Sequence, residues 1–295
     1  MTTSTNRLLI ALIACVPLAP LAVSGQKEAS SAPPPSPGKL LQMAYSKDAE
    51  AGSATAQFEL GLLYLSGKSG AEQDFEKARK WITKSSNQGY SQSQILLAGM
   101  FHDGIGTAKN SSESVLWLLK AIEKKNEVKS YNLEPKQLAN AYFSLGLCFQ
   151  SGDGVKSDLD KSFDFFFKAA ELDHPKAQVQ VGCFYSSGWA VKEDKKESIN
   201  WYEKAAKQGE FQGLYMLGNC FKEGKGVPQN FVESYKWYSL AAAISNASAD
   251  AGNTRENVLS LDALRLRDEL AKKMTTEQIA EAQERAEKYW ANMKK

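Results

Sequence analysis

The chain has 295 residues and a net charge of +2, from 36 Lys and Arg against 34 Asp and Glu. Because the two signs are intermixed and form no basic stretch, we expect no nucleic-acid partner. The two histidines, His102 and His174, are far apart, and no nucleophile stands at a workable spacing from a base. We therefore expect neither an enzyme nor a cofactor or metal.

The first 25 residues differ in kind from the rest. Arg7 precedes an apolar run from Leu8 to Val23, which is too short and too broken by proline to be a convincing membrane span. Ala22 and Ser24 supply the small residues of a cleavage site. Residues 1–25 are therefore predicted to be a secretory signal peptide, which makes the chain secreted or periplasmic and leaves no transmembrane segment in the mature chain.

A second interpretation of this segment stays open. Leu12-Ile13-Ala14-Cys15 resembles a bacterial lipobox, which would leave Cys15 as a lipidated N-terminus and the chain as a membrane-anchored lipoprotein. Residues 26–36, rich in Pro and Ser, form an extended tether under either interpretation. Ser36-Pro37-Gly38-Lys39 has the S-x-x-K spelling of a serine acylase, but in a Pro-rich tether we interpret it as coincidence.

Beyond the tether, a Gly or Ala stands 19 or 20 residues before an aromatic residue five times, about every 36 residues. The pairs are Gly61/Trp81, Ala98/Trp117, Gly146/Phe165, Gly182/Trp201 and Gly218/Trp237. Self-similarity at this period is typical of a solenoid, in which each unit buries its apolar face against its neighbours.

Each small residue lies in a first helix, helix A, where apolar residues at offsets of about four share one face. Six residues later stands a Gly that can end this helix in the left-handed conformation: Gly67, Gly104, Gly152, Gly188 and Gly224. The second helix, helix B, is predicted to begin after an N-cap: Asp74, Asn110, Asp158, Asp194 and Asn230. Glu113, Glu197 and Glu233 would complete capping boxes.

These motifs resemble the Sel-one-like repeat family, a branch of the tetratricopeptide superfamily. Ala56-Gln57, Ala177-Gln178, Trp201-Tyr202 and Gln208-Gly209 match it closely, and the resemblance covers about residues 37 to 293. It implies an all-α fold, a right-handed superhelical solenoid of antiparallel helix pairs.

The predicted solenoid begins with a capping helix at 37–52, which reads as a lone helix B. Five repeats follow, at 53–89, 90–137, 138–173, 174–209 and 210–252, and then a C-terminal helical cap at 253–295. The cap should contain helices at Arg255–Lys273 and Thr276–Met293, the second capped by Thr275 or Thr276, with a polar outer face.

Repeats 2 and 3 are separated by extra residues, since Ala98 and Gly146 stand 48 positions apart. We expect this insert, near residues 123–136, to fold over Leu119 and Phe167.

The repeat register also orders the thiols. Cys183 falls where helix A of a tetratricopeptide faces the concave side, whereas Cys148 and Cys220 face neighbouring helices. We expect Cys183 to react quickly and the other two only on unfolding, with no disulfide among them. The alternative is that all three are buried small apolar residues.

The resemblance implies three ligand positions on each helix A: three before the small residue, one after it and four after it. The first set is Phe58, Ile95, Phe143, Val179 and Tyr215; the second is Leu62, Gly99, Leu147, Cys183 and Asn219; the third is Leu65, His102, Gln150, Ser186 and Lys222. These positions are apolar in the N-terminal half and more polar in the C-terminal half. The first set could equally be ordinary core between repeats.

From the resemblance we expect a non-enzymatic adaptor or scaffold that binds a protein or peptide on the concave face. One alternative is an envelope-anchored scaffold that acts through its convex face or tether. A remote one is a hydrolase, because some family members are described as β-lactamase-like.

Overall fold

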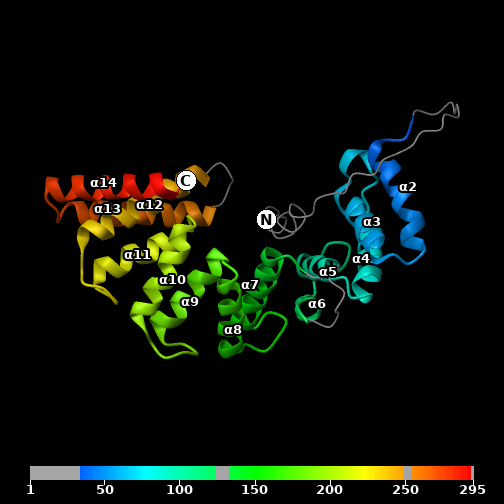
Figure 1. Cartoon of the computed structure of the whole chain (residues 1–295), viewed down its shortest axis with the longest axis horizontal. Coiled ribbons are helices and arrows are strands. Elements are labelled where there is room, and N and C mark those ends of the chain that lie inside the picture. Colours follow the sequence, from blue (N-terminus) through cyan, green and yellow to red (C-terminus); the bar gives the residue numbers. More distant parts are fainter. Residues whose placement is uncertain (1–33, 124–132, 249–253, 294–295) are drawn as a thin grey trace. The chain divides into compact units, whose positions relative to one another are not determined.

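The computed structural model describes residues 34–123, 133–248 and 254–293, whose regular elements are all helices (Figure 1). They are α2 (Pro37–Glu50), α3 (Ala54–Ser66), the short 3₁₀ turn η1 (Lys68–Gly70), α4 (Phe75–Asn87), α5 (Ser91–Asp103), α6 (Ser111–Ile122), α7 (Pro135–Ser151), α8 (Leu159–Glu171), α9 (Pro175–Ser187), α10 (Lys195–Lys207), α11 (Phe211–Glu223), α12 (Phe231–Ser248), α13 (Thr254–Ala271) and α14 (Thr276–Met293).

The chain divides into two compact units, one ending at Ser157 and the other beginning at Asp158. In the first unit α3 packs on α4 and α5 on α6, with α2 ahead of them and α7 after them. In the second unit α9 packs on α10 and α11 on α12, with α8 before them and α13 and α14 after them. The predicted fold class, a solenoid of helix pairs, is confirmed.

The small residue of helix A lets helix B approach closely. A Cβ atom on Gly182 would lie 2.5 Å from the Tyr202 ring, and one on Gly218 would lie 2.6 Å from the Tyr238 ring. Since real Cβ atoms do not approach other atoms so closely, these positions tolerate no side chain without a shift of helix B. The register that predicts the repeats is therefore a packing requirement.

The turn between the helices has two left-handed positions. The five predicted glycines all have φ between 60° and 78° and end their helices. The second glycine of the turn approaches the preceding repeat, because a Cβ on Gly106 would lie 2.2 Å from the carbonyl oxygen of Phe75. Gly226 approaches Lys195 in the same way, at 2.4 Å. This glycine therefore sets the contact between successive repeats.

The predicted N-caps of helix B are confirmed, but the predicted capping boxes are not. The side chains of Asp74, Asn110, Asp158, Asp194 and Asn230 each accept a hydrogen bond from a backbone N–H of the first turn. In a box, Glu113 and Glu197 would accept from the N-cap N–H. Instead, the N–H of Asn110 donates to Phe101 O at 2.8 Å and that of Asp194 donates to Tyr185 O at 2.9 Å. The backbone N–H of each N-cap therefore bonds a carbonyl group of helix A and is not available to the glutamate side chain.

Buried glutamines connect each repeat to the one before it. Gln94 Nε2 donates to Ser86 O at 3.1 Å, and Gln178 Nε2 donates to Ala170 O at 3.3 Å. Gln57 makes the equivalent bond to Ala49 O of α2, at 3.0 Å. α2 therefore receives the bond that a helix B receives elsewhere in the array, and no helix A precedes it among the described residues.

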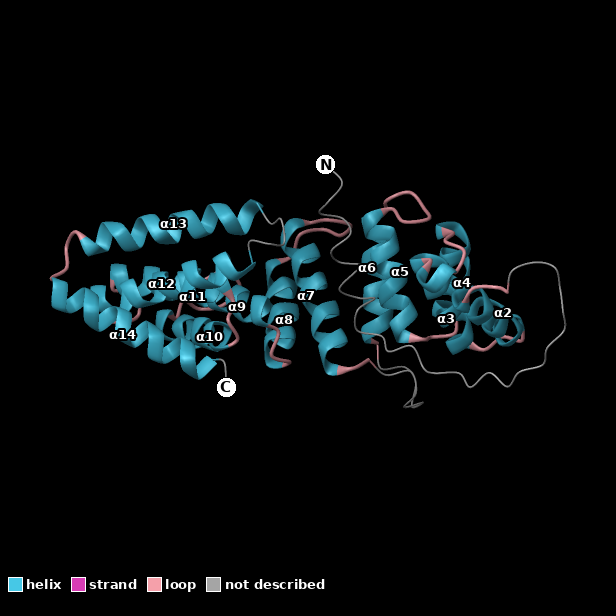
Figure 2. Ribbon diagram, turned by 90° about the horizontal axis from the view of Figure 1, so that it is seen from above, coloured by secondary structure: helices cyan, strands magenta, loops and turns pink. Residues whose placement is uncertain are grey.

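The C-terminal helices extend the stack (Figure 2), since both α13 and α14 pack on α12. Tyr215 of α11 donates a hydrogen bond to Asp262 of α13 at 2.5 Å. The rings of Trp237 on α12 and Tyr289 on α14 meet edge to face, with centroids 4.9 Å apart. Thr275 caps α14, as one of the two predicted candidates.

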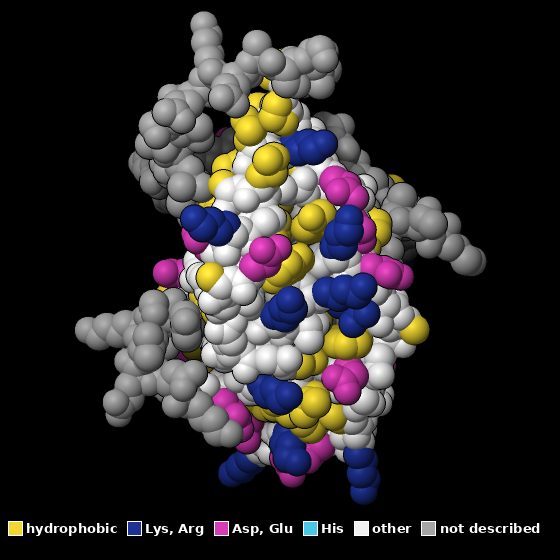
Figure 3. Space-filling view, turned by 90° about the vertical axis from the view of Figure 1, so that its right-hand side faces the viewer, with side chains coloured by type: hydrophobic (Ala, Val, Ile, Leu, Met, Phe, Trp, Pro, Cys, Tyr) yellow, Lys and Arg dark blue, Asp and Glu magenta, His cyan; other side chains and the backbone are white. Residues whose placement is uncertain are grey.

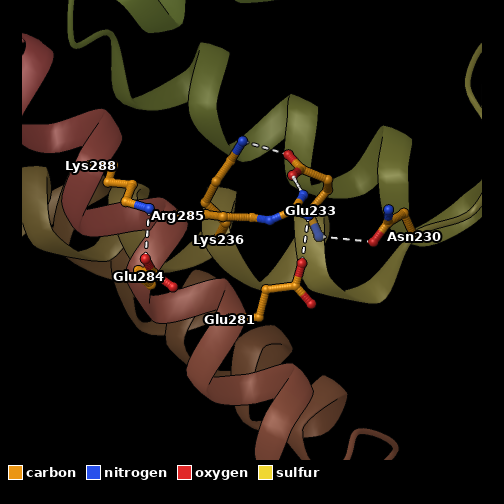
Figure 4. Close-up of polar contacts among 7 residues, drawn as sticks. All are labelled: Asn230, Glu233, Lys236, Glu281, Glu284, Arg285 and Lys288. Carbon is orange, nitrogen blue, oxygen red and sulfur yellow. Dashed lines mark hydrogen bonds and ion pairs between the residues drawn. The ribbon is translucent and has the colours of Figure 1, made fainter.

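An ion-pair cluster joins α12 to α14 (Figure 4). Glu233 accepts from Lys236 one turn further along α12 and from Arg285 of α14. Burial alone would raise the pKa of Glu233, but these two hydrogen bonds outweigh it and lower the pKa. The Glu233 carboxylate is therefore charged, and its ion pair with Arg285 links α12 to α14.

Residues 124–132 of the predicted insert lie outside the described residues, so its expected fold over Leu119 and Phe167 is not tested. Its last part begins α7 early, at Pro135, where Glu134 and Gln137 form a capping box. Phe167 packs against Phe163 at 5.7 Å and against Trp201 of the next repeat at 5.6 Å between centroids. The following repeat thus supplies a large part of its burial.

Candidate functional site

The ligand positions of repeats 1 and 2 are mostly core. Phe58, Leu62 and Leu65 on α3 are buried, as are Ile95 and Gly99 on α5. Phe58 packs on Tyr90 of the next repeat, with ring centroids 5.2 Å apart. Val179 of repeat 4 is also buried. For the first set, this burial favours the alternative of ordinary core between repeats. Leu62, Leu65 and Gly99, which were expected to face a partner, are covered by neighbouring helices as well.

In repeats 4 and 5 the polar positions are engaged inside the chain. Tyr202 of α10 donates to Cys183 Sγ at 3.5 Å, and Tyr238 of α12 donates to Asn219 Oδ1 at 2.6 Å. Tyr215 is bonded to Asp262. The predicted polar gradient therefore reflects internal pairing between helices A and B. In this unit Ser186 and Lys222 remain partly exposed ligand positions.

Repeat 3 differs, because α7 leaves all three of its ligand positions at least partly exposed. Phe143 and Gln150 are half-buried, and the side chain of Leu147 is 39% exposed, whereas the equivalent Leu62 is 7% exposed. The three residues follow one another at offsets of four and three, so they share one side of the helix. We call this surface the α7 face.

The α7 face is neutral. The helix contains one lysine, Lys136 in its first turn, and no acidic residue. Burial raises the pKa of the neighbouring Cys148 thiol to about 11, with a contribution from the charge of Asp153, and burial also raises the pKa of Tyr142. These groups are uncharged near neutral pH, so the surface suits an apolar or hydrogen-bonding partner.

The predicted difference between the thiols is not what the structure shows. Cys148 and Cys183 are both partly exposed, and only Cys220 is buried. Burial raises the pKa of all three, to about 11 for Cys148 and Cys220. Since the thiolate is the reactive form, no rapid reaction of Cys183 alone is expected. All three are free thiols.

The two histidines have separate structural surroundings. His102, a ligand position of repeat 2, lies with its Nδ1 2.7 Å from Asp103 Oδ1. His174 is the N-cap of α9, where its Nδ1 accepts from the Ala177 N–H at 3.1 Å. Burial lowers the pKa of His174 to about 4, with a contribution from Lys176. The repeat register could have predicted this cap, because Ser53 caps α3 at the equivalent place.

The S-x-x-K sequence has a structural role. Ser36 is the N-cap of α2, where its hydroxyl accepts from the Lys39 N–H and donates to Gly70 O at 2.6 Å. Within the described ranges, no group of three or more His, Cys, Asp or Glu side chains could hold a metal ion. No described helix is both long and apolar enough to cross a bilayer. Cys15 and the predicted signal peptide lie outside the described residues.

Together, the paired helices and the repeated packing of a small residue of helix A against helix B define a helical-repeat solenoid. The model of the Sel1 repeat matches residues 54–90, 91–126, 139–174, 175–210 and 212–246, more than half of the chain. The chain therefore belongs to the Sel1 repeat family. Proteins of this family generally mediate protein–protein interactions and are generally non-enzymatic.

Similar proteins come from both fungi and bacteria. The chain is 29% identical over 137 residues to chitin synthase regulatory factor 3 of Schizosaccharomyces pombe. The matched region covers 45% of this chain and 13% of that protein. A crystal structure of a Sel1 repeat protein from Oxalobacter formigenes is 25% identical with a TM-score of 0.58, covering 69% of this chain and 84% of that one. The protective antigen c5321 of uropathogenic Escherichia coli is 22% identical with a TM-score of 0.44, covering 85% and 66%.

Proposed function

We propose that the chain is a non-enzymatic interaction scaffold that holds a segment of a partner protein against the α7 face. The observation that carries this proposal is the exposure of Leu147 at a ligand position whose equivalent in repeat 1 is buried. An apolar side chain flanked by partly exposed aromatic and amide groups is a typical protein-binding surface. Such a surface would take an apolar anchor of the partner between Phe143 and Leu147, and Gln150 would bond its backbone.

Photo-crosslinking in the native cell tests this. A benzoylphenylalanine at position 150, beside Leu147, should capture one discrete protein. Leu147→Arg should lower that capture about tenfold, since it removes an apolar contact and introduces a charge that the partner must desolvate. Leu116→Arg on α6 is the matched control, because Leu116 is 44% exposed but lies on helix B. Equal capture by both folded variants would rule out the α7 face.

We further propose that the scaffold acts outside the cytoplasm, secreted or periplasmic after removal of residues 1–25, or anchored through a lipid on Cys15. The support is the sequence pattern of the first 25 residues. Mass spectrometry of the native N-terminus distinguishes a chain starting near residue 26 from an acylated Cys15. An unprocessed Met1 would contradict both. An anchored chain whose partner ignores Leu147→Arg would favour the alternative of a scaffold that acts through its convex face or tether.

A further inference from the structure

Among the described residues, the first helix of the stack, α2, is a helix B that no helix A precedes. In repeat 1, Ala78 and Ile82 of α4 are fully buried, and Gly61 of α3 lies against them. Aligning Gly52 with Gly89 places Leu41 and Tyr45 of α2 at the same two positions. The side of α2 that carries them is therefore the side that a helix A covers elsewhere.

This side of α2 is open in the part of the chain that the structure describes. α2 packs mainly on α3, the next helix A, and on the turn η1. Leu41 and Tyr45 are half-buried, whereas Ala78 and Ile82 at the equivalent positions of α4 are fully buried. Figure 3 shows hydrophobic side chains between Lys, Arg, Asp and Glu on the end of the molecule where Figure 1 places α2. We call the side of α2 that carries Leu41 and Tyr45 the open face.

A partly buried carboxylate borders the open face. Glu59 of α3 lies near Tyr45, since burial and the charge of Glu59 together raise the pKa of Tyr45. Glu59 Oε2 is buried and has no hydrogen-bond partner among the described residues, and burial raises the pKa of Glu59. A buried carboxylate without a donor is costly, so this place favours a ligand that brings one.

We propose that the open face docks an amphipathic α-helix of a partner protein, which lies on Leu41 and Tyr45 as a helix A lies on helix B and brings a Lys or Arg to Glu59. The fold defines the shape of this occupant, because every inner helix B is covered by a helix. The unpaired carboxylate defines its charge. A second copy docked end to end fits less well, because α14 at the other end is rich in exposed Glu, Lys and Arg.

The chain itself supplies a probe. Position three before the small residue faces the following repeat, as the contacts of Phe58 with Tyr90 and of Tyr215 with Asp262 show. A helix docked ahead of α3 would therefore present this position toward α3, which carries Glu59. We choose two stapled, fluorescein-labelled peptides that copy residues 175–187 with Cys183→Ser, one of them also carrying Val179→Lys; the staple offsets the marginal helicity of a 13-residue peptide.

Fluorescence anisotropy with the full chain should give saturable binding that is about tenfold tighter for the Val179→Lys peptide, as expected for a charge-assisted hydrogen bond. Glu59→Gln should abolish this preference, because the neutral amide keeps the shape and loses the charge. Leu41→Glu should weaken both peptides about tenfold. Leu41→Ala should do so in part, because it shortens the side chain without adding a charge, and it covers the case in which Leu41→Glu fails to fold.

Leu261→Glu on α13 is the matched control, since Leu261 is 67% exposed at the other end, and it should leave binding unchanged. The proposal is overturned if neither peptide saturates, if Leu261→Glu weakens binding as much as Leu41→Ala, or if Glu59→Gln leaves the preference intact. A photo-crosslinker at Leu41 that joins residues before 34 or a second copy would likewise overturn it. This surface is separate from the α7 face, so either proposal can fail alone.

Discussion

The two ends of the repeat array are built differently. At the C-terminal end a complete helix pair closes the last repeat: α13 bonds Tyr215 through Asp262, and α14 packs Tyr289 on Trp237 and pairs Arg285 with Glu233. At the N-terminal end of the described residues a single helix B, α2, stands before repeat 1, and Met43 on its solvent side is 63% exposed. Closing an array of repeats requires a helix pair whose outer side is polar.

The sequences of the terminal helices explain this difference. α14 turns Ala282 and Ala286 inward and is otherwise rich in Glu, Lys and Arg. α2 turns Gly38, Gln42 and Ala49 toward its neighbours and keeps leucine and methionine on its other sides. The C-terminal helix therefore exposes a polar surface to water, whereas α2 exposes apolar area that a further helix could bury.

The largest expected effect breaks the closed end. Trp237→Ala removes a buried ring and its contact with Tyr289, and should lower the free energy of unfolding by about 3 to 5 kcal/mol. Tyr45→Ala at the open end removes a half-buried ring and should cost about 1 to 2 kcal/mol. Urea unfolding gives both values, and hydrogen exchange in α14 should rise only for Trp237→Ala. Equal losses at the two ends would contradict the comparison.

The sequence predicts those parts of the fold that depend on local rules. The small residue at Gly182, the left-handed Gly188 and the N-cap Asp194 each act through chain geometry that every repeat shares. The helix bounds follow from these positions to within a residue or two. The lone helix B at α2 was predictable because Gly52 falls in the same register as Gly209.

The candidate site was predictable only in part, because exposure depends on which neighbour covers a residue. Leu62 and Leu147 hold the same register position, yet one is buried and the other exposed. Tyr202 and Cys183 are 19 residues apart, as are Tyr238 and Asn219, so the repeat register could have predicted both hydrogen bonds. The family resemblance instead assigns Cys183 and Asn219 to a partner-binding surface, because it does not specify which helix B side chain lies opposite each helix A position. Glu113 and Glu197 fail as capping boxes because the carbonyl groups of the preceding helix A accept the N–H.

A second prediction tests whether a partly exposed ring of one repeat is stabilised by the repeat that follows it. Phe167→Ser should cost about 1 to 3 kcal/mol, because the ring packs on Phe163 and on Trp201 of the following repeat. Thermal unfolding of the variant beside the native chain measures this. Thr83→Ser, two positions after the equivalent aromatic Trp81 of repeat 1, is the control and should change little. A loss below about 0.5 kcal/mol for Phe167→Ser would show that the ring is exposed.

A third prediction concerns the N-terminus of α9, which lies inside the array: the stability that its N-cap contributes should depend on pH. The cap of α9 needs neutral His174, whose pKa is lowered to about 4 from an ordinary value near 6.5. The protonated form is disfavoured in the folded chain, so this contribution is complete above pH 6.5 and is lost as the pH falls toward 4. The native chain should lose about 1 to 3 kcal/mol more over that range than His174→Asn, which keeps a capping oxygen without titrating. Parallel pH profiles of urea unfolding would refute this role.

The smallest expected effect tests the ion pair between Glu233 of α12 and Arg285 of α14. Arg285→Gln should cost about 0.5 to 1 kcal/mol, because it takes one of two cations from Glu233, which stays partly buried and keeps Lys236. The loss should shrink in 1 M NaCl, since salt screens the contribution of this pair. Lys288→Gln is the control on the same helix. Its pair with Glu284 lies within α14 and both side chains are exposed, so the free energy of unfolding should not change measurably (Figure 4). If the two variants cost the same, α14 is held by its apolar contacts with α12 alone, and the closed end owes nothing to its charges.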